Sequence, residues 1–307
     1  MSETAMRDRK MSRRQASALL LLSPLLPTAL SRGAHAQQDT KGSSSGPLEI
    51  DITQGTLAPI PIAIPRFMGD DARFSSEVTG VVIGDLERSG LFKALDQTSF
   101  IDQVRDINSS PRFQDWRVIN AQALVVGRAG RSQDGRYFVE FRLYDVLSQR
   151  ELVAKRFASE AVDWRRLAHR VADQVYERLT GEKGYFDTQI VFVDETGPKE
   201  RRRKRLAIMD QDGANVRLLS QGQELVLTPR FSPTSQEITY LQYIGDQPRV
   251  QLMNLDTGAH EMVGNFPGMT FAPRFSPDGQ RIVMSIGEGG ASALVEMDLR
   301  TRRTKRL

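Results

Sequence analysis

A five-residue motif that occurs twice limits the possible folds of this chain more than any other feature. Pro-Arg-Phe-Ser-Pro occurs at residues 229–233 and again at 273–277, an offset of 44 residues. The same offset separates Asn254-Leu-Asp-Thr-Gly from Asp298-Leu-Arg-Thr-Arg. A fixed period of about 40–50 residues built from short strands is typical of β-propeller blades. The repeat therefore predicts an all-β propeller region over residues 184–307.

Turn residues divide this region into short strands. Asp212-Gly213, Thr257-Gly258 and Asp278-Gly279 are turn signals between apolar, β-branched runs. We expect each blade to contain three successive strands followed by the Phe-Ser-Pro motif. The aromatic ring of that motif should fill the space between neighbouring blades.

The first 36 residues have the pattern of a cleaved export signal. A basic stretch precedes an apolar run from Ala16 to Leu30, which contains Pro24 and Pro27, and Ala34-His-Ala36 is a small-x-small cleavage site before Gln37. The apolar run is too short for a membrane-spanning helix, which needs about 20 residues. The sequence thus predicts cleavage between Ala36 and Gln37, no membrane insertion afterwards, and a flexible polar segment over residues 37–46. Whether export follows the general or the twin-arginine route stays open.

Charge and cysteine content narrow the function classes. The chain has 42 Lys and Arg against 38 Asp and Glu, but residues 1–36 hold six of the former and two of the latter. The mature chain then has 36 of each, so overall charge implies no nucleic-acid partner. With no cysteine, thiol nucleophiles and cysteine-based zinc sites are excluded.

Residues 47–181 predict a compact α+β domain. An alternating segment at 48–53 and a proline-bounded run at 60–65 favour strands, and a helix is expected over 74–89, capped by Ser75 or Ser76 and ended by Gly90. Strands at 123–127, 136–146 and 151–158 should form a meander whose hairpin turns at Asp134-Gly135. A second helix is expected from Asp163, ending at Gly181.

Motifs that could carry chemistry have simpler explanations. Gly42-Ser-Ser-Ser-Gly46 matches the G-x-S-x-G hydrolase pattern but lacks the strand before it and the helix after it that the motif requires. The basic run at 199–205 is typical of a solvated hairpin loop. Of three histidines, His35 belongs to the signal, His169 is predicted on the polar side of its helix, and His260 lies in a propeller strand or turn. We expect no catalytic, metal or cofactor site.

The chain resembles the TolB family, the periplasmic component of the Tol–Pal envelope system, in its combination of sequence motifs. The resemblance rests on Ile-x-Ile-Thr-x-Gly, Pro-Ile-Ala-Ile-Pro, the segment Asp-Leu-Glu-Arg-Ser-Gly-Leu-Phe at 85–92, and Phe-Ser-Pro-Asp-Gly. It implies a periplasmic, non-catalytic adaptor that links the peptidoglycan-associated lipoprotein Pal to the C-terminal domain of TolA. Such an adaptor serves outer-membrane integrity, cell division and protein import.

The resemblance also implies two binding sites. TolA would take the N-terminal segment, which matches Leu48, Glu49, Ile50, Asp51, Ile52 and Thr53, and an alternating segment on a flexible leader suits strand addition to a partner's sheet. Pal would bind at the mouth of the propeller channel. The candidates there are Arg274 and a loop before the second copy of the repeated motif. The loop contains Pro267, Gly268, Met269, Thr270 and Phe271.

TolB-like propellers have six blades, whereas the 124 residues of 184–307 hold fewer than three periods of 44. We therefore expect either a truncated product or a chain completed by a partner, because a partial propeller leaves strand edges unpaired. Downstream DNA that encodes further Phe-Ser-Pro motifs in the same reading frame would identify a truncation. An alternative function is the non-catalytic propeller of an exported serine peptidase.

Overall fold

The computed structural model describes residues 58–160, 164–264, 266 and 268–307. The predicted TolA-binding segment, the signal and its cleavage site, the G-x-S-x-G match, Asp163 and Pro267 lie outside these residues. Described residues 58–181 form the α+β domain and the later ones form β-sheets, as expected. The domain contains, in chain order, β1 (Ile60–Ala63), α1 (Ala72–Arg88), β2 (Phe92–Ala94), α2 (Phe113–Val118), β3 (Ala123–Arg131), β4 (Tyr137–Asp145), β5 (Arg150–Ser159) and α3 (Trp164–Thr180).

The five strands form one mixed sheet in the order β2-β1-β3-β4-β5. β1 runs parallel to β2 and β3, whereas β3, β4 and β5 make the predicted antiparallel meander. Gly135 adopts a φ of 86° in the β3–β4 hairpin, a conformation that glycine adopts without steric cost. β2 and α2 were not predicted. Both are short, and neither has a hydrophobic period long enough to read.

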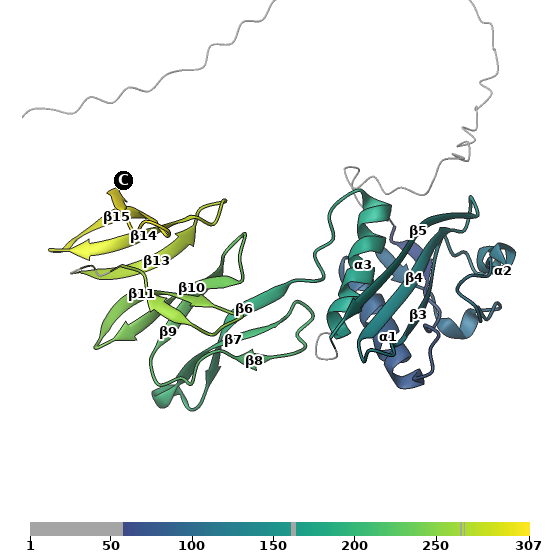
Figure 1. Cartoon of the computed structure of the whole chain (residues 1–307), viewed down its shortest axis with the longest axis horizontal. Coiled ribbons are helices and arrows are strands. Elements are labelled where there is room, and N and C mark those ends of the chain that lie inside the picture. The colour runs from purple at the N-terminus through teal and green to yellow at the C-terminus, as the bar shows by residue number, and fades with distance from the viewer. Residues whose placement is uncertain (1–57, 161–163, 265, 267) are drawn as a thin grey trace, which may run out of the picture. The chain divides into compact units, whose positions relative to one another are not determined.

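Helices α1 and α3 pack together on one face of this sheet, and α2 lies on the other (Figure 1). On α1, four apolar residues at i, i+4 spacing are at most 5% exposed: Phe74, Val78, Val82 and Leu86. The predicted cap is wrong: Asp71, not Ser75 or Ser76, accepts hydrogen bonds from the backbone N–H groups of Arg73 and Phe74 at 3.0 Å. Helix α1 therefore begins two residues earlier than its periodicity indicated.

Beyond the domain, three sheets follow in chain order. A three-stranded sheet contains β6 (Gln189–Thr196), β7 (Arg203–Asp210) and β8 (Arg217–Leu218). The next contains β9 (Val226–Phe231), β10 (Glu237–Ile244), β11 (Gln247–Asn254) and β12 (His260–Met262). The last contains β13 (Met269–Phe275), β14 (Arg281–Glu288), β15 (Ala291–Asp298) and β16 (Thr304–Arg306). The two four-stranded sheets repeat at 44 residues from β10 to β14, from β11 to β15 and from β12 to β16.

Each sheet is one blade, and the blades pack through apolar clusters. Phe231 is partly buried against the cluster that joins the first and second blades, and Phe275 against the one that joins the second and third. This confirms the expected packing role of the repeated aromatic residue. The expected strand order is wrong, because Phe231 and Phe275 end the first strand of their blades rather than following the third. The first blade has no strand equivalent to β9 or β13 in the described residues, so fewer than three full blades are present.

The basic run at 199–205 is only partly the predicted hairpin loop, because its last three residues, Arg203, Lys204 and Arg205, begin β7. A short 3-10 helix (Lys199–Arg201) joins β6 to β7, and Lys199, Arg201 and Arg203 are exposed. Arg202 and Lys204 pair with Glu195, and Arg205 pairs with Asp194. In the part of the chain that the structure describes, no helix is both long and apolar enough to cross a membrane.

Candidate partner-binding sites

The candidate Pal-binding residues form a strand rather than the expected loop. Residues from Met269 onward belong to β13, which pairs with β14 along Met269–Phe271 and Arg274–Phe275. Pro267-Gly268 is a turn signal in the sequence, and it gave no indication that a strand begins at Met269. Thr270 is 2% exposed and its hydroxyl accepts a hydrogen bond from the backbone N–H of Val250 at 2.9 Å.

Two of the candidates present side chains to solvent. Met269 is 48% exposed at the start of the strand, and Arg274 is exposed near its end. Phe271 is half-buried and packs against the core of the second and third blades. Of the described candidates, Met269 and Arg274 are therefore the side chains most available to a partner.

A bulge in β13 separates these two side chains. The register with β14 shifts between Phe271 and Arg274, and Ala272 has a φ of 55°. The equivalent residue of the second blade, Thr228, has a φ of 48° beside the corresponding shift in β9. A positive φ is uncommon outside glycine and is an outlier for a β-branched residue. The bulge is therefore a repeated structural device of the blades.

A second candidate site is a charged cluster on the helical face of the α+β domain. It combines Asp85 and Arg88 of α1, Arg165 and His169 of α3, and residues Asp210, Gln211 and Asp212 at the end of β7 and in the turn that follows. Oδ1 of Asp85 accepts from the Gln211 amide at 2.9 Å and from Arg88 at 2.9 Å. These contacts attach the turn after β7 to the helix pair.

His169 lies on the polar side of α3, as predicted, but it is buried inside this cluster. The helix period correctly placed it away from the sheet, but the turn after β7 covers that side of α3 and leaves His169 only 1% exposed. Ligand atoms of Asp85, His169 and Asp212 lie within 4.8 Å of one another, a grouping that could hold a metal ion. The residues are separated by 84 and 43 positions, so no sequence motif could have revealed them.

Electrostatic interactions in the cluster shift the pKa values of His169 and Asp212. Burial lowers the pKa of His169, but the hydrogen bond with Asp85 and the charges of Asp85, Asp212 and Asp210 outweigh it, so that pKa is raised above its ordinary value. Burial raises the pKa of Asp212, yet the backbone N–H of Ala214 and the charge of Arg165 hold it below the usual value. The cluster thus favours a charged histidine among charged carboxylates.

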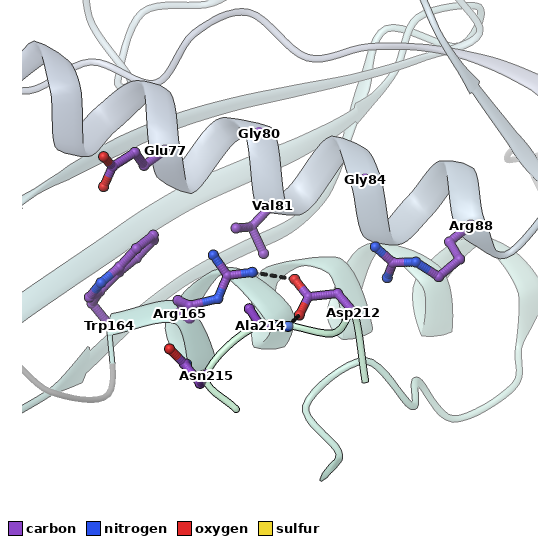
Figure 2. A pocket seen from close by; sticks show the side chains of 10 residues that line it. All are labelled: Glu77, Gly80, Val81, Gly84, Arg88, Trp164, Arg165, Asp212, Ala214 and Asn215. Carbon is purple, nitrogen blue, oxygen red and sulfur yellow. Dashed lines mark hydrogen bonds and ion pairs between the residues drawn. The ribbon is translucent and has the colours of Figure 1, made fainter. Parts of the chain in front are cut away.

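An open groove of about 550 Å³ lies next to the cluster. Figure 2 shows Glu77, Gly80, Val81 and Gly84 of α1 along one side, with Trp164 and Arg165 of α3 and the 212–215 turn opposite. A Cβ added at Gly80 would meet nothing within 4 Å, and one at Gly84 only the end of the Arg88 side chain at 3.7 Å. The two glycines therefore widen the groove.

An α+β domain followed by Phe-Ser-Pro blades makes this chain a two-domain propeller protein. Family models for the TolB amino-terminal domain and the TolB beta propeller domain match residues 48–152 and 176–307. The crystal structure of TolB from Acinetobacter baumannii is 30% identical with a TM-score of 0.69, covering 81% of this chain and 60% of that one. The chain belongs to the TolB family. It spans about three fifths of the length of the A. baumannii protein.

Two other solved structures are less similar. A putative TolB from Agrobacterium tumefaciens is 15% identical with a TM-score of 0.34, covering 58% of this chain and 63% of that chain. An acylaminoacyl peptidase from Pyrococcus horikoshii is 12% identical with a TM-score of 0.31, covering 39% of this chain and 23% of that chain. Neither bears on function at these values, and the peptidase likeness gives no support to the peptidase alternative.

Proposed function

We propose that this chain is a periplasmic, non-catalytic adaptor of the Tol–Pal system, which links Pal to the C-terminal domain of TolA. The observation that carries the proposal is the ordered match of both TolB domains, together with the fold shared with A. baumannii TolB. The export signal in the sequence supports a periplasmic location. In this role the protein contributes to outer-membrane integrity, envelope constriction during division, and protein import.

The TolA contact is proposed at residues 48–53. This segment alternates apolar and polar side chains and follows a polar leader, so it can add as a strand to the edge of a partner's sheet. Main-chain hydrogen bonds would give affinity, and Leu48, Ile50 and Ile52 would enter pockets on one face. If Pal and TolA favour different states of the segment, their binding is coupled by the difference in those affinities.

The Pal contact is proposed on the third blade, at Met269 and Arg274. Met269 is an unbranched apolar side chain, half-exposed beside the Gly268 backbone, and Arg274 adds an exposed cation from the same strand. Methionine adapts to irregular partner surfaces, and arginine and methionine are both enriched at interfaces. The buried Thr270 holds β13 against β11, because its hydroxyl accepts a hydrogen bond from Val250.

The two sites can be tested separately on the mature chain, residues 37–307. Deleting residues 37–53 should abolish capture of the TolA C-terminal domain and leave Pal binding intact. Met269→Ser should weaken Pal by about tenfold, the usual scale for an interface side chain worth about 1–2 kcal/mol. Leu294→Ser is the matched control, since Leu294 is 51% exposed on β15 of the same blade.

Loss of both partners on deletion, or of neither, counts against the assignment. An equal effect of Met269→Ser and Leu294→Ser would remove Met269 from the Pal surface. Hydrolysis of peptide substrates by the purified protein would support the peptidase alternative instead.

A further inference from the structure

The buried charged cluster contains one histidine whose protonation decides its charge balance. Three carboxylates act on His169: Asp85 of α1, Asp210 at the end of β7 and Asp212 in the turn that follows. Arg88 pairs with Asp85, and Arg165 pairs with Asp210 and Asp212. Asp173 lies one turn after His169 on α3, and its charge acts on Asp85. His169 and Asp85 are at most 1% exposed and Asp210 is 5% exposed. Charges this well excluded from water interact much more strongly than surface pairs do.

One ring nitrogen of His169 is satisfied and the other is not. Nδ1 lies 2.6 Å from Oδ2 of Asp85, to which it donates a hydrogen bond. Nε2 lies 3.9 Å from Oδ2 of Asp210 and has no hydrogen-bond partner in the described residues. Nε2 therefore faces a carboxylate across a short gap.

The two protonation states of Nε2 are not equivalent in this position. In neutral imidazole, Nε2 presents a lone pair to the Asp210 carboxylate, a buried acceptor opposite an acceptor. In imidazolium, Nε2 carries a proton that is directed at Asp210, so that a small closure of the 3.9 Å gap makes a charge-assisted hydrogen bond. Only the protonated ring joins α1 to β7 through both nitrogens.

The count of neighbouring charges favours the same state. With His169 protonated, Arg88, Arg165 and His169 provide three positive charges for Asp85, Asp210 and Asp212. With His169 neutral, the three carboxylates outnumber the two arginines, and this excess negative charge is costly because Asp85 and Asp210 are almost completely buried. Asp173 adds to this excess. Burial raises the pKa of its carboxyl, although the backbone N–H groups of Phe186 and Asp187 donate to it and lower that pKa.

We propose that His169 is a proton-controlled latch that holds the turn after β7, residues 210–212, on the α1–α3 helix pair. In the protonated state the ring bridges Asp85 and Asp210 and fixes the first blade to the α+β domain. Loss of the proton leaves Asp210 opposed by a lone pair and loosens this attachment, while the helix pair and the blade keep their own cores.

The direction of the pH effect follows from the geometry. The carboxylates raise the pKa of His169 in the closed state above that of the free side chain. A group of this kind contributes stability that is complete below the open-state pKa, near 6.5, and is lost as the pH rises through the closed-state pKa. The latch therefore holds at mildly acidic pH and releases on the alkaline side.

A metal ion explains the cluster less well. Both oxygens of Asp85 already accept from protein donors, Oδ1 from Gln211 and Arg88 and Oδ2 from His169. Asp212 accepts from Arg165 and from the backbone N–H of Ala214. A cation bound there would have to displace two arginines, each of which already supplies the positive charge that these carboxylates need.

The test is a pH titration of the mature chain, residues 37–307, with two readouts. The ring resonances of its two histidines, His169 and His260, are followed by NMR. Hydrogen exchange of the Gln211 side-chain amide, which donates to Oδ1 of Asp85 at 2.9 Å, is measured over the same range and corrected for intrinsic rates. His169 should titrate above about 6.5, the ordinary pKa of a histidine side chain. Protection of Gln211 should fall through that same titration, by about tenfold for each pH unit between the closed-state and open-state pKa values.

Three variants separate the latch from simple packing. His169→Gln should remove the pH-dependent step in Gln211 protection, and His260→Gln should leave it unchanged. Asp210→Asn keeps the histidine and should move its titration to lower pH while shrinking the step. The proposal is overturned if His169 titrates at or below about 6.5, or if the step survives in His169→Gln. Saturable protection of the turn by Zn²⁺ that EDTA reverses would also overturn it, in favour of a metal site.

Discussion

Gly184 lies in the segment that connects the α+β domain to the first blade, at a position with no room for a side chain. It lies just after α3, where a Cβ would come within 2.5 Å of the Cα, Cβ and Oδ1 atoms of Asp173. Asp173 holds this connection by accepting hydrogen bonds from the backbone N–H of Phe186 at 2.6 Å and of Asp187 at 3.2 Å. Gly184→Ala therefore forces the chain away from the helix.

The expected loss can be built from these contacts. Overpacking against a fixed backbone atom costs about 1–3 kcal/mol. Weakening the Phe186 hydrogen bond to a carboxylate adds about 1 kcal/mol, and Phe186 itself is fully buried in the domain core. Gly184→Ala should thus lower the free energy of unfolding of the α+β domain by about 2–4 kcal/mol.

Urea unfolding followed by tryptophan fluorescence measures this loss, because both tryptophans of the chain, Trp116 and Trp164, lie in the α+β domain. Gly80→Ala is the matched control. Gly80 is exposed in α1 with open space around it, so its replacement should stabilise the same domain by up to about 1 kcal/mol. A Gly184→Ala protein within about 0.5 kcal/mol of the parent would refute the packing argument.

Three further substitutions test the cap, the bulge and the packing between blades. Asp71→Ala removes the two N-terminal hydrogen bonds of α1 and should cost about 1 kcal/mol in the same fluorescence assay, and no change would exclude Asp71 as the cap. Thr228→Gly relieves a φ of 48° at a β-branched residue and should stabilise the propeller region by about 1 kcal/mol in denaturant unfolding followed by circular dichroism; destabilisation would contradict the assigned backbone. Met284→Ala empties a fully buried position between the second and third blades and should cost about 2–5 kcal/mol by the same method, whereas a loss under about 1 kcal/mol would mean that the two blades do not pack there.

The sequence predicted those parts of the fold that depend on local periodicity. The 44-residue repeat located two blades, and the i, i+4 apolar spacing located α1 and α3 on the core. Prediction failed at a helix boundary that lies outside the apolar pattern, and where tertiary contacts decide the outcome. Asp71 is the cap of α1 because its backbone precedes the first helical turn, a boundary that the apolar pattern does not mark.

The buried cluster shows most clearly what local patterns miss. His169 lies on the side of α3 that faces away from the sheet, and a helical period alone assigns such a position to solvent. Only the fold brings residues 210–212, about forty positions later, over that side. Conversely, Met269 to Phe275 reads as a loop because Pro267 and Gly268 adjoin it, although its pairing with β14 makes it the first strand of a blade.

The most direct test of the adaptor assignment is a calorimetric titration of the mature chain, residues 37–307, with soluble Pal. We expect saturable binding of one Pal per chain. Deletion of residues 37–53 should leave this binding unchanged. Binding of the TolA C-terminal domain to that segment of the intact chain should alter the affinity for Pal. No heat of binding from a correctly folded chain would contradict the central claim that this TolB-family protein links Pal to TolA.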